Sequence, residues 1–289
     1  MARKSQSSSE KEIRYISPLR YPGGKARLAK FLKSVFEAND LVGGAYAEPY
    51  AGGAGAALAL LFTGHAANIY INDVDPAIHA FWFSVLHKTK SLCRLVRNTP
   101  VTPREWEHQR RIYANGNTAA PLALGFAAFF LNRTNRSGII DSGSMIGGRD
   151  QAGQWKLDVR YNREGLISRI ELIAKCRKRI HLSSLDAIDF LRHLGKTLPA
   201  KSLVYLDPPY FTNGRRLYAN YYETQDHARV AELLSESPLR WLVSYDNVPV
   251  IRRLYRGYRS RTYTMQYTAA GKKQGVEAMF FSPSLLVPI

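Results

Sequence analysis

Short apolar segments alternate with amphipathic stretches over two parts of the 289-residue chain. The apolar segments typical of strands are 45–50, 68–73, 179–184, 203–207, 241–246, 260–267 and 276–282. Helical patterns separate the first five of them, at 55–63, 75–90, 163–177, 186–195 and 225–236. This alternation predicts a mostly parallel α/β sheet with helices on both faces. The last two strands follow each other without a helix, which predicts an antiparallel hairpin at the sheet edge.

The alternation stops between residues 86 and 169. Two helical patterns occur there, the second at 122–131, and a stretch rich in glycine, serine and charge follows at 139–162. We predict a helical module inserted between the second and third strands, with 139–162 as a mobile excursion outside the core. The predicted division is a disordered tail at 1–12, a main domain at 13–85 and 170–289, and the inserted module at 86–169.

The charge balance narrows the choice of partners. Lysine and arginine number 41 and aspartate and glutamate 23, which gives a formal charge of +18. A basic excess spread along a folded chain favours a nucleic-acid partner, although a well-solvated basic surface is the alternative. No apolar run approaches the ~20 residues that span a bilayer, so no membrane partner is expected. Cys93 and Cys176 lack the spacing of a zinc site, and they favour a reducing cytoplasm. The oligomeric state is left open, and a monomer is acceptable.

A glycine-rich turn follows the first predicted strand, in "EPYAGGAGAALALL" (48–61). Gly52, Gly53 and Gly55 allow a sharp bend and a close approach of the backbone to a ligand. Asp73 ends the next strand about 20 residues later, where a carboxylate suits the hydroxyls of a ribose. This pattern serves NAD, FAD and S-adenosylmethionine alike, and a tight turn without a ligand is the alternative.

A second glycine pair lies upstream, in "LRYPGGKARLAKFL" (19–32). It is not a Walker A loop, because Ala26 follows the lysine where a hydroxyl would be needed to hold magnesium. We expect a loop that lays Tyr21 and Lys25 over a ligand, with Lys25 pairing with a carboxylate. The alternative is a surface lysine at the start of a helix.

The fourth predicted strand ends in an acid, two prolines and a tyrosine, in "LVYLDPPYF" (203–211). Asp207 can accept a hydrogen bond, and Pro208 and Pro209 hold their carbonyl groups in set directions. Tyr210 offers a flat ring for stacking. Together they suit a planar ring with an exocyclic amino group, whose lone pair would be directed toward a methyl donor. The alternative is a proline-stiffened turn.

These segments resemble the DNA adenine-N6 methyltransferases of the Dam-like, D12 class, over about residues 14–282. The shared segments are "RYPGGK" (20–25), "EPYAGGAG" (48–55), "IND" (71–73), "FFLNRTNRSG" (129–138) and "DPPY" (207–210). The resemblance implies a Rossmann-like methyltransferase sheet with an inserted helical DNA-recognition domain. It also implies S-adenosylmethionine as methyl donor and no metal. The residues implied in cofactor contact are Tyr21, Lys25, Asp73 and Asp207, and Asp207 to Tyr210 are implied in holding a flipped adenine.

Other candidates remain open at this point. Asp186 either approaches the cofactor or caps the helix that follows it. Arg133, Asn135 and Arg136 are expected to contact DNA, since arginine forks onto guanine and asparagine pairs with adenine. Contact of the two arginines with phosphate is the alternative.

The expected activity is site-specific methylation of adenine N6 in double-stranded DNA, with the target base flipped out of the helix. An RNA adenine methyltransferase and a non-catalytic protein that binds cofactor and DNA are the alternatives.

Overall fold

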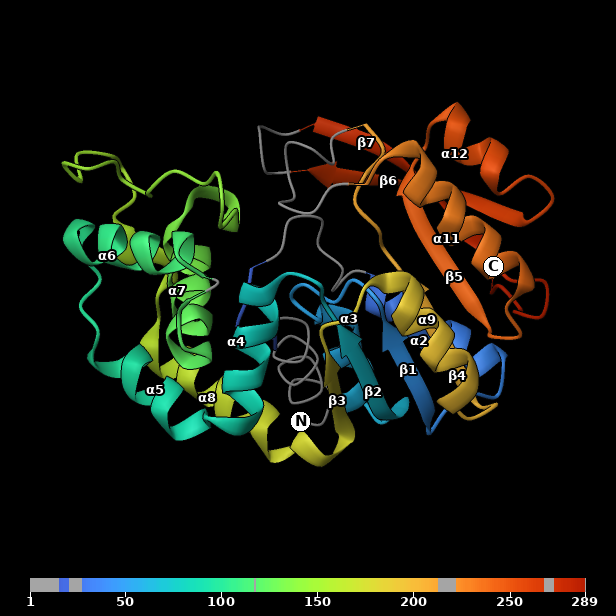
Figure 1. Cartoon of the computed structure of the whole chain (residues 1–289), viewed down its shortest axis with the longest axis horizontal. Helices are drawn as coiled ribbons and strands as arrows, with labels where there is room; N and C mark the ends of the chain where they lie inside the picture. Colours follow the sequence, from blue (N-terminus) through green and yellow to red (C-terminus); the bar gives the residue numbers. More distant parts are fainter. Residues whose placement is uncertain (1–15, 21–27, 117, 213–221, 268–272, 289) are drawn as a thin grey trace, which may run out of the picture. The chain divides into compact units, whose positions relative to one another are not determined.

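The computed structural model describes residues 16–20, 28–116, 118–212, 222–267 and 273–288 (Figure 1). The chain divides into two compact units. The sheet unit comprises Met1–Ile16, Gly23–Val74 and Arg179–Ile289, and the helical unit comprises Ser17–Pro22 and Asp75–Lys178. Within the described ranges, no helix has the length and apolar character needed to cross a membrane.

The sheet unit contains a seven-stranded mixed sheet. Its strands are β1 (Gly44–Glu48), β2 (Ala66–Asn72), β3 (Ile180–Ser183), β4 (Ser202–Leu206), β5 (Trp241–Asp246), β6 (Arg259–Tyr267) and β7 (Lys273–Phe281). The order is β3-β2-β1-β4-β5-β7-β6, and β7 is antiparallel to both of its neighbours. The prediction of a mostly parallel sheet with an antiparallel edge hairpin is therefore confirmed.

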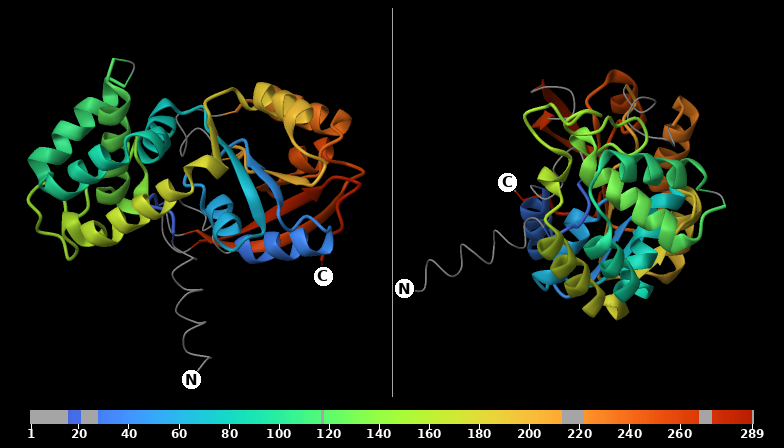
Figure 2. Two further views of the ribbon diagram at one scale, coloured as in Figure 1. Left: turned by 90° about the horizontal axis from the view of Figure 1, so that it is seen from below. Right: turned by 90° about the vertical axis from the view of Figure 1, so that its left-hand side faces the viewer.

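Helices cover both faces of this sheet. They are α2 (Leu28–Ala38), α3 (Gly55–Phe62), α9 (Ala187–Thr197), α11 (Thr224–Glu236) and α12 (Pro249–Leu254). The left view of Figure 2 shows α2 and α3 on one side and α9 and α11 on the other. Every residue of β1 and β4 is consequently buried, as expected for central parallel strands.

The strand order reverses at β1. Strands β2 and β3 lie on one side of β1, whereas β4 and β5 lie on its other side, so the switch point is between β1 and β4. Ligands of open α/β sheets bind outside the carboxyl ends of the strands at this switch point. The glycine turn after β1 and the DPPY segment after β4 both follow strands at this edge.

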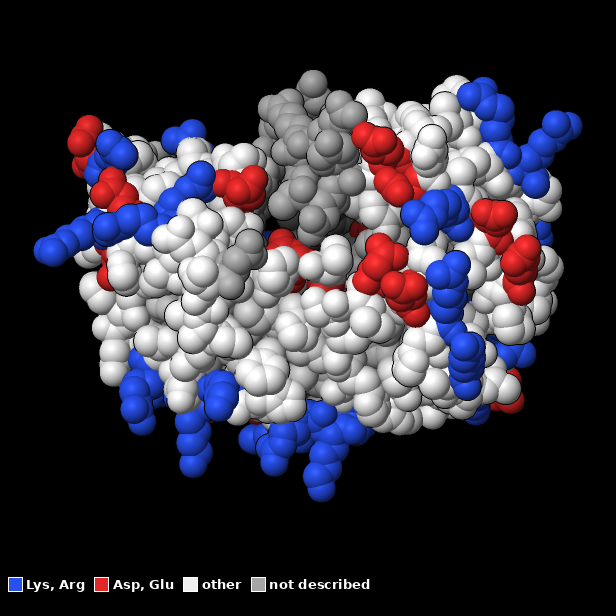
Figure 3. Space-filling view, viewed as in Figure 1, with Lys and Arg blue, Asp and Glu red and all other residues white. Residues whose placement is uncertain are grey.

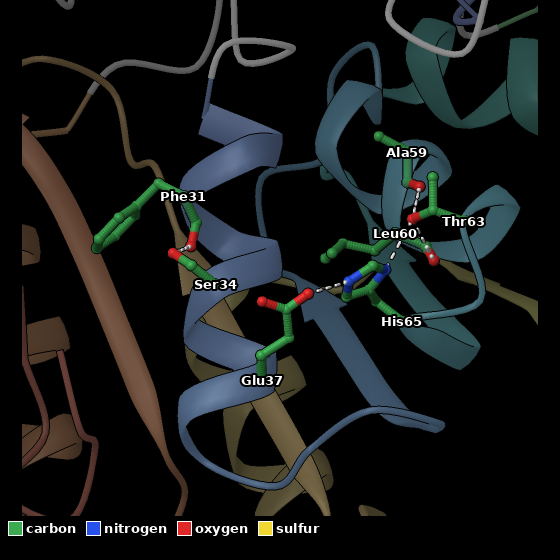
Figure 4. Close-up of polar contacts among 7 residues, drawn as sticks. All are labelled: Phe31, Ser34, Glu37, Ala59, Leu60, Thr63 and His65. Carbon is green, nitrogen blue, oxygen red and sulfur yellow. Dashed lines mark hydrogen bonds and ion pairs between the residues drawn. The ribbon is translucent and has the colours of Figure 1, made fainter. Parts of the chain in front are cut away.

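A polar link between helix and sheet lies at the opposite, amino end of β2 (Figure 4). The His65 Nε2 atom is 3.2 Å from Oε1 of Glu37 on α2, and its Nδ1 atom is 3.0 Å from Oγ1 of Thr63. Thr63 also donates to the Ala59 carbonyl at 2.7 Å. These contacts connect α2 with the turn before β2, and they stabilise the fold away from the carboxyl edge.

The helical unit contains α4 (Pro76–His87), α5 (Thr89–Asn98), α6 (Pro103–Ala114), α7 (Pro121–Thr134) and α8 (Arg163–Lys175). Gly125 lets α7 approach α4 closely, since a Cβ atom there would lie 2.4 Å from the Ala80 carbonyl oxygen. The helix expected at 75–90 thus packs within this unit, which extends beyond the range of 86–169. Residues 139–162 are not wholly outside the core, because Met145 and Leu157 are buried.

Candidate active site

Asp207 lies directly after β4 and is half-buried, whereas Pro208 and Pro209 are buried. Its Oδ1 atom accepts a hydrogen bond from Ser244 Oγ at 2.9 Å. The Ser244 hydroxyl lies 2.8 Å from that of Tyr205, so Tyr205 donates to Ser244. Burial and the charge of Asp207 raise the pKa of Tyr205 well above its ordinary value, which keeps Tyr205 a donor. Two buried hydroxyl groups therefore orient the Asp207 carboxylate.

The backbone after the DPPY segment is held by Asp246, the last residue of β5. Its Oδ1 atom accepts from the N–H of Phe211 and its Oδ2 atom from the N–H of Thr212, both at 2.9 Å. Both carboxylate oxygens thus bind consecutive amides of one loop. Sequence reasoning missed this role, because nothing in the sequence pairs residue 246 with residues 211 and 212.

Tyr210 is half-buried, and its hydroxyl donates to Glu277 Oε1 at 2.7 Å. The hydroxyl of Tyr263 donates to Oε2 of the same carboxylate. Glu277 lies on β7 and is only 2% exposed. The sequence held one signal of this residue, namely a single acid inside the apolar strand "VEAMFF" (276–281).

The glycine turn between β1 and α3 is left-handed at two positions. Gly52 has φ +48°, a region that favours glycine, and Ala54 has φ +48° as well. The Gly52 N–H donates to Asp73 Oδ2 at 2.8 Å, so Asp73 ties the end of β2 to this turn. A Cβ atom at Gly55 would meet nothing within 4 Å among the described residues. Gly53 lies between the two left-handed residues, Gly52 and Ala54.

Asn72 was quoted in the sequence only as part of "IND", and the structure gives it a central place. It is fully buried. Its Nδ2 atom donates to the carbonyls of Pro49 at 3.0 Å and Leu185 at 2.9 Å. Its Oδ1 atom accepts from the Ser183 hydroxyl and the Leu185 N–H, both at 2.8 Å. Asn72 therefore joins the carboxyl ends of β1, β2 and β3.

Two cofactor candidates lie outside the described residues, namely Tyr21 and Lys25. Asp186 is exposed, and its side chain accepts from the N–H of Ile188 at 2.8 Å. It is the N-cap of α9, so the capping alternative is confirmed. Its contact with a cofactor stays a prediction.

Asn135 in the helical unit is fully buried and engaged within its own unit. Its Oδ1 atom accepts from Trp106 Nε1 at 2.6 Å, and its Nδ2 atom donates to the carbonyl of Ile139 at 2.8 Å. An adenine contact would require these bonds to be given up inside the core, at a cost of about 1–3 kcal/mol for each unsatisfied group. We therefore do not retain Asn135 as a base-contacting residue.

The two predicted arginines differ in their surroundings. Arg136 is exposed, whereas Arg133 is half-buried and donates from Nε to the Arg160 carbonyl at 2.8 Å. Burial, together with the charges of Arg20, Arg169 and Arg160, lowers the pKa of Arg133 to about 9. None of the ion pairs found in the described part of the chain includes these four arginines. We call Arg20, Arg133, Arg160 and Arg169 the arginine cluster.

No metal site emerges from the residues that the structure describes. Nowhere among them do three or more histidine, cysteine, aspartate or glutamate side chains gather in a way that could hold an ion.

Solved structures of methyltransferases are remotely similar to this chain. A putative RNA methyltransferase from Pyrococcus horikoshii is 10% identical with a TM-score of 0.41, over 89% of this chain and 84% of that chain. A SAM-dependent methyltransferase from Agrobacterium tumefaciens is 11% identical with a TM-score of 0.40, over 90% and 62%. TrmN from Thermus thermophilus is 12% identical with a TM-score of 0.37, over 88% and 48%. No curated protein matched the sequence.

The family comparison covers most of the chain. The model of the D12 class N6 adenine-specific DNA methyltransferases matches residues 21–269. That range contains the glycine turn, Asp73, the helical unit from Asp75 onward and the DPPY segment, in the order in which the structure presents them. The chain belongs to the D12 class of N6 adenine-specific DNA methyltransferases.

Proposed function

We propose that the carboxyl edge of the sheet, between the glycine turn and the DPPY segment, is where this methyltransferase acts on adenine. The observation that carries this proposal is the oriented carboxylate of Asp207. It lies at the switch point of the sheet, directly before two buried prolines, and Ser244 and Tyr205 hold it in place. A carboxylate held by other residues is pre-organised to accept an amino hydrogen.

The residues near the glycine turn fit S-adenosylmethionine. Ala54 has no side-chain acceptor with which to cap α3, so the first N–H groups of that helix suit an anionic ligand. Among the described residues nothing lies within 4 Å of a Cβ atom built at Gly55, which would suit the close approach of a ligand. Asp73 would take the ribose, with Tyr21 stacking and Lys25 pairing with the carboxylate of the ligand. The bound cofactor supplies an electrophilic methyl group on its sulfonium.

The protein contributes placement of the acceptor. Asp207 accepts one hydrogen of the adenine amino group, and the Pro208 carbonyl accepts the other. Tyr210 stacks on the base, which is worth roughly 1–3 kcal/mol and offsets part of the cost of flipping it. With both amino hydrogens held, the nitrogen lone pair would be less conjugated with the ring and available to attack the methyl group.

Methyl incorporation from labelled S-adenosylmethionine tests this proposal directly. The purified chain should label double-stranded DNA, and digestion of the product should yield N6-methyladenine. An equal amount of structured RNA should remain unlabelled. Labelling of RNA alone would favour an RNA adenine methyltransferase, and binding of cofactor and DNA without labelling would favour a non-catalytic protein.

Removal of the Asp73 carboxylate should weaken cofactor binding. Asp73→Ala loses the proposed ribose contact and the bond from the Gly52 N–H to Asp73, so we expect the dissociation constant of S-adenosylmethionine to rise by about tenfold or more. Isothermal titration calorimetry measures this constant. Asp189→Ala is the matched control, since Asp189 is an exposed acid on α9 in the same unit. Equal affinity in both variants would limit Asp73 to a structural role.

The helical unit is proposed to bind DNA through the arginine cluster. Burial lowers the pKa of Arg133 and of Arg20, and the positive charges of neighbouring arginines lower both further, Arg160 among them in each case. DNA phosphates would supply counter-charge to this cluster. Lysine and arginine side chains also project from several places on the face in Figure 3, in keeping with the formal charge of +18. Exposed Arg136 is proposed to read a base.

Two arginine variants should separate base reading from phosphate contact. Arg136→Ala is expected to cost about 1–3 kcal/mol at the cognate site and to methylate near-cognate sites relatively better than the wild type. Arg160→Ala should weaken binding to all sequences alike and lower the slope of log affinity against log salt by about one. Methylation of a duplex panel and titrations at several salt concentrations measure both effects. A uniform loss for Arg136→Ala would assign this residue to the backbone of DNA.

We propose a cytoplasmic location for this protein, and the absence of a disulfide between its two cysteines, both of which the structure describes, is compatible with it. Cys93 and Cys176 are both free. Burial raises the pKa of the Cys93 thiol to about 11, which keeps it protonated and unreactive at neutral pH.

A further inference from the structure

Glu277 is a buried carboxylate whose position in the sheet is energetically unfavourable without compensating hydrogen bonds. On β7 it lies directly opposite Asp246 of β5 and opposite Tyr263 of β6. Two acids directly opposite each other on antiparallel strands repel. Burial of a carboxylate is also costly unless hydrogen bonds compensate for the lost water. A second acid at this point of the sheet therefore needs a reason beyond strand pairing.

Hydrogen-bond donors compensate for the partial burial of Asp246 and the burial of Glu277. Three of these donors belong to consecutive residues. Asp246 accepts from the N–H groups of Phe211 and Thr212 at 2.9 Å. Glu277 accepts from the Tyr210 hydroxyl at 2.7 Å and from the Tyr263 hydroxyl. We call Asp246 and Glu277 the carboxylate clamp. It holds residues 210–212, which include the end of the DPPY segment.

The clamp restrains the one ring that is proposed to stack on the target base. Pro209 restricts the backbone before Tyr210, and Asp246 holds the amides after it. Glu277 holds the far end of the side chain through the hydroxyl. A ring restrained at both ends loses less conformational entropy when a base stacks on it.

We propose that Glu277 is a positioning residue for methyl transfer, which keeps the Tyr210 ring in the orientation that the flipped adenine needs. This inference rests on the function proposed above. Glu277 does not touch the reacting atoms and acts only through the Tyr210 hydroxyl. Tyr263 donates to the other oxygen of the carboxylate and belongs to its support.

A double-mutant cycle between residues 210 and 277 tests this inference. Glu277→Leu should lower kcat by about three- to tenfold, the equivalent of one hydrogen bond, and leave the KM for S-adenosylmethionine unchanged. Tyr210→Phe should lower kcat by a similar factor. The double variant should be no slower than either single variant, because the same bond is lost in each.

Two further variants distinguish positioning from support of the hairpin. Glu277→Gln retains an acceptor for the Tyr210 hydroxyl and should restore kcat to within about threefold of the wild type. Tyr263→Phe removes the other donor but keeps the contact between Glu277 and Tyr210, so kcat should fall less than in Glu277→Leu. Thermal unfolding of each variant gives the folded fraction to which kcat is referred.

Several outcomes would overturn the inference. If the fold-loss of kcat in the double variant equalled the product of the two single losses, Glu277 would not act through Tyr210. A Glu277→Leu protein with lower thermal stability and wild-type kcat would give Glu277 a structural role alone. Should this variant not fold, wild-type kcat in Tyr210→Phe would equally exclude the proposal. Absence of turnover in the wild type is a separate result, and it contradicts the proposed function itself.

Discussion

Replacing Asp207 with alanine is expected to lower methyl transfer by on the order of 10²–10³-fold, the typical cost of losing one pre-organised group. The variant loses the acceptor that faces the adenine amino group. The Ser244 hydroxyl loses its acceptor but keeps the hydrogen bond with Tyr205, so the fold should survive. Initial rates with labelled S-adenosylmethionine and duplex DNA, together with thermal unfolding, measure the two effects.

A graded control accompanies this variant. Asp207→Asn keeps an oxygen that accepts from Ser244 and should retain more activity than Asp207→Ala. Asp189→Ala, an exposed acid on α9, should match the wild type. Near-wild-type turnover in Asp207→Ala would show that this carboxylate does not place the acceptor.

Removal of the Tyr210 ring should have the second-largest effect. Loss of stacking costs about 1–3 kcal/mol per base, so Tyr210→Ala should lower activity by roughly 5- to 150-fold. Tyr210→Phe keeps the flat ring and loses only the bond with Glu277, for an expected loss of no more than about tenfold. Tyr210→Trp retains a flat ring and should therefore also be more active than Tyr210→Ala.

Steady-state rates of the Tyr210 variants under saturating cofactor provide the measurement. Phe211→Leu is a useful comparison, since Phe211 follows Tyr210 and packs against buried apolar residues of the sheet unit. If the phenylalanine variant were as inactive as the alanine variant, the hydroxyl rather than the ring would be the important group. That result would contradict the stacking role.

The sequence by itself determined the sheet and the position of its chemistry. Alternating apolar and amphipathic segments are local patterns, so they predicted all the strands of the sheet and the edge hairpin of β6 and β7. The glycine turn and the DPPY segment are also local, because a backbone bend and a ring after two prolines depend on neighbouring residues. Parallel strands then bring both segments to the same edge of the sheet.

Only the tertiary structure decided which side chains meet. Asp246 binds amides 34 and 35 residues away, and Glu277 binds a hydroxyl 67 residues away. These pairs depend on strand order and register, which no local pattern in one sequence reveals. Burial is decided in the same way. Asn135 lies in a polar motif that suggested contact with DNA, yet packing of the helical unit encloses it, and its amide bonds within the unit instead.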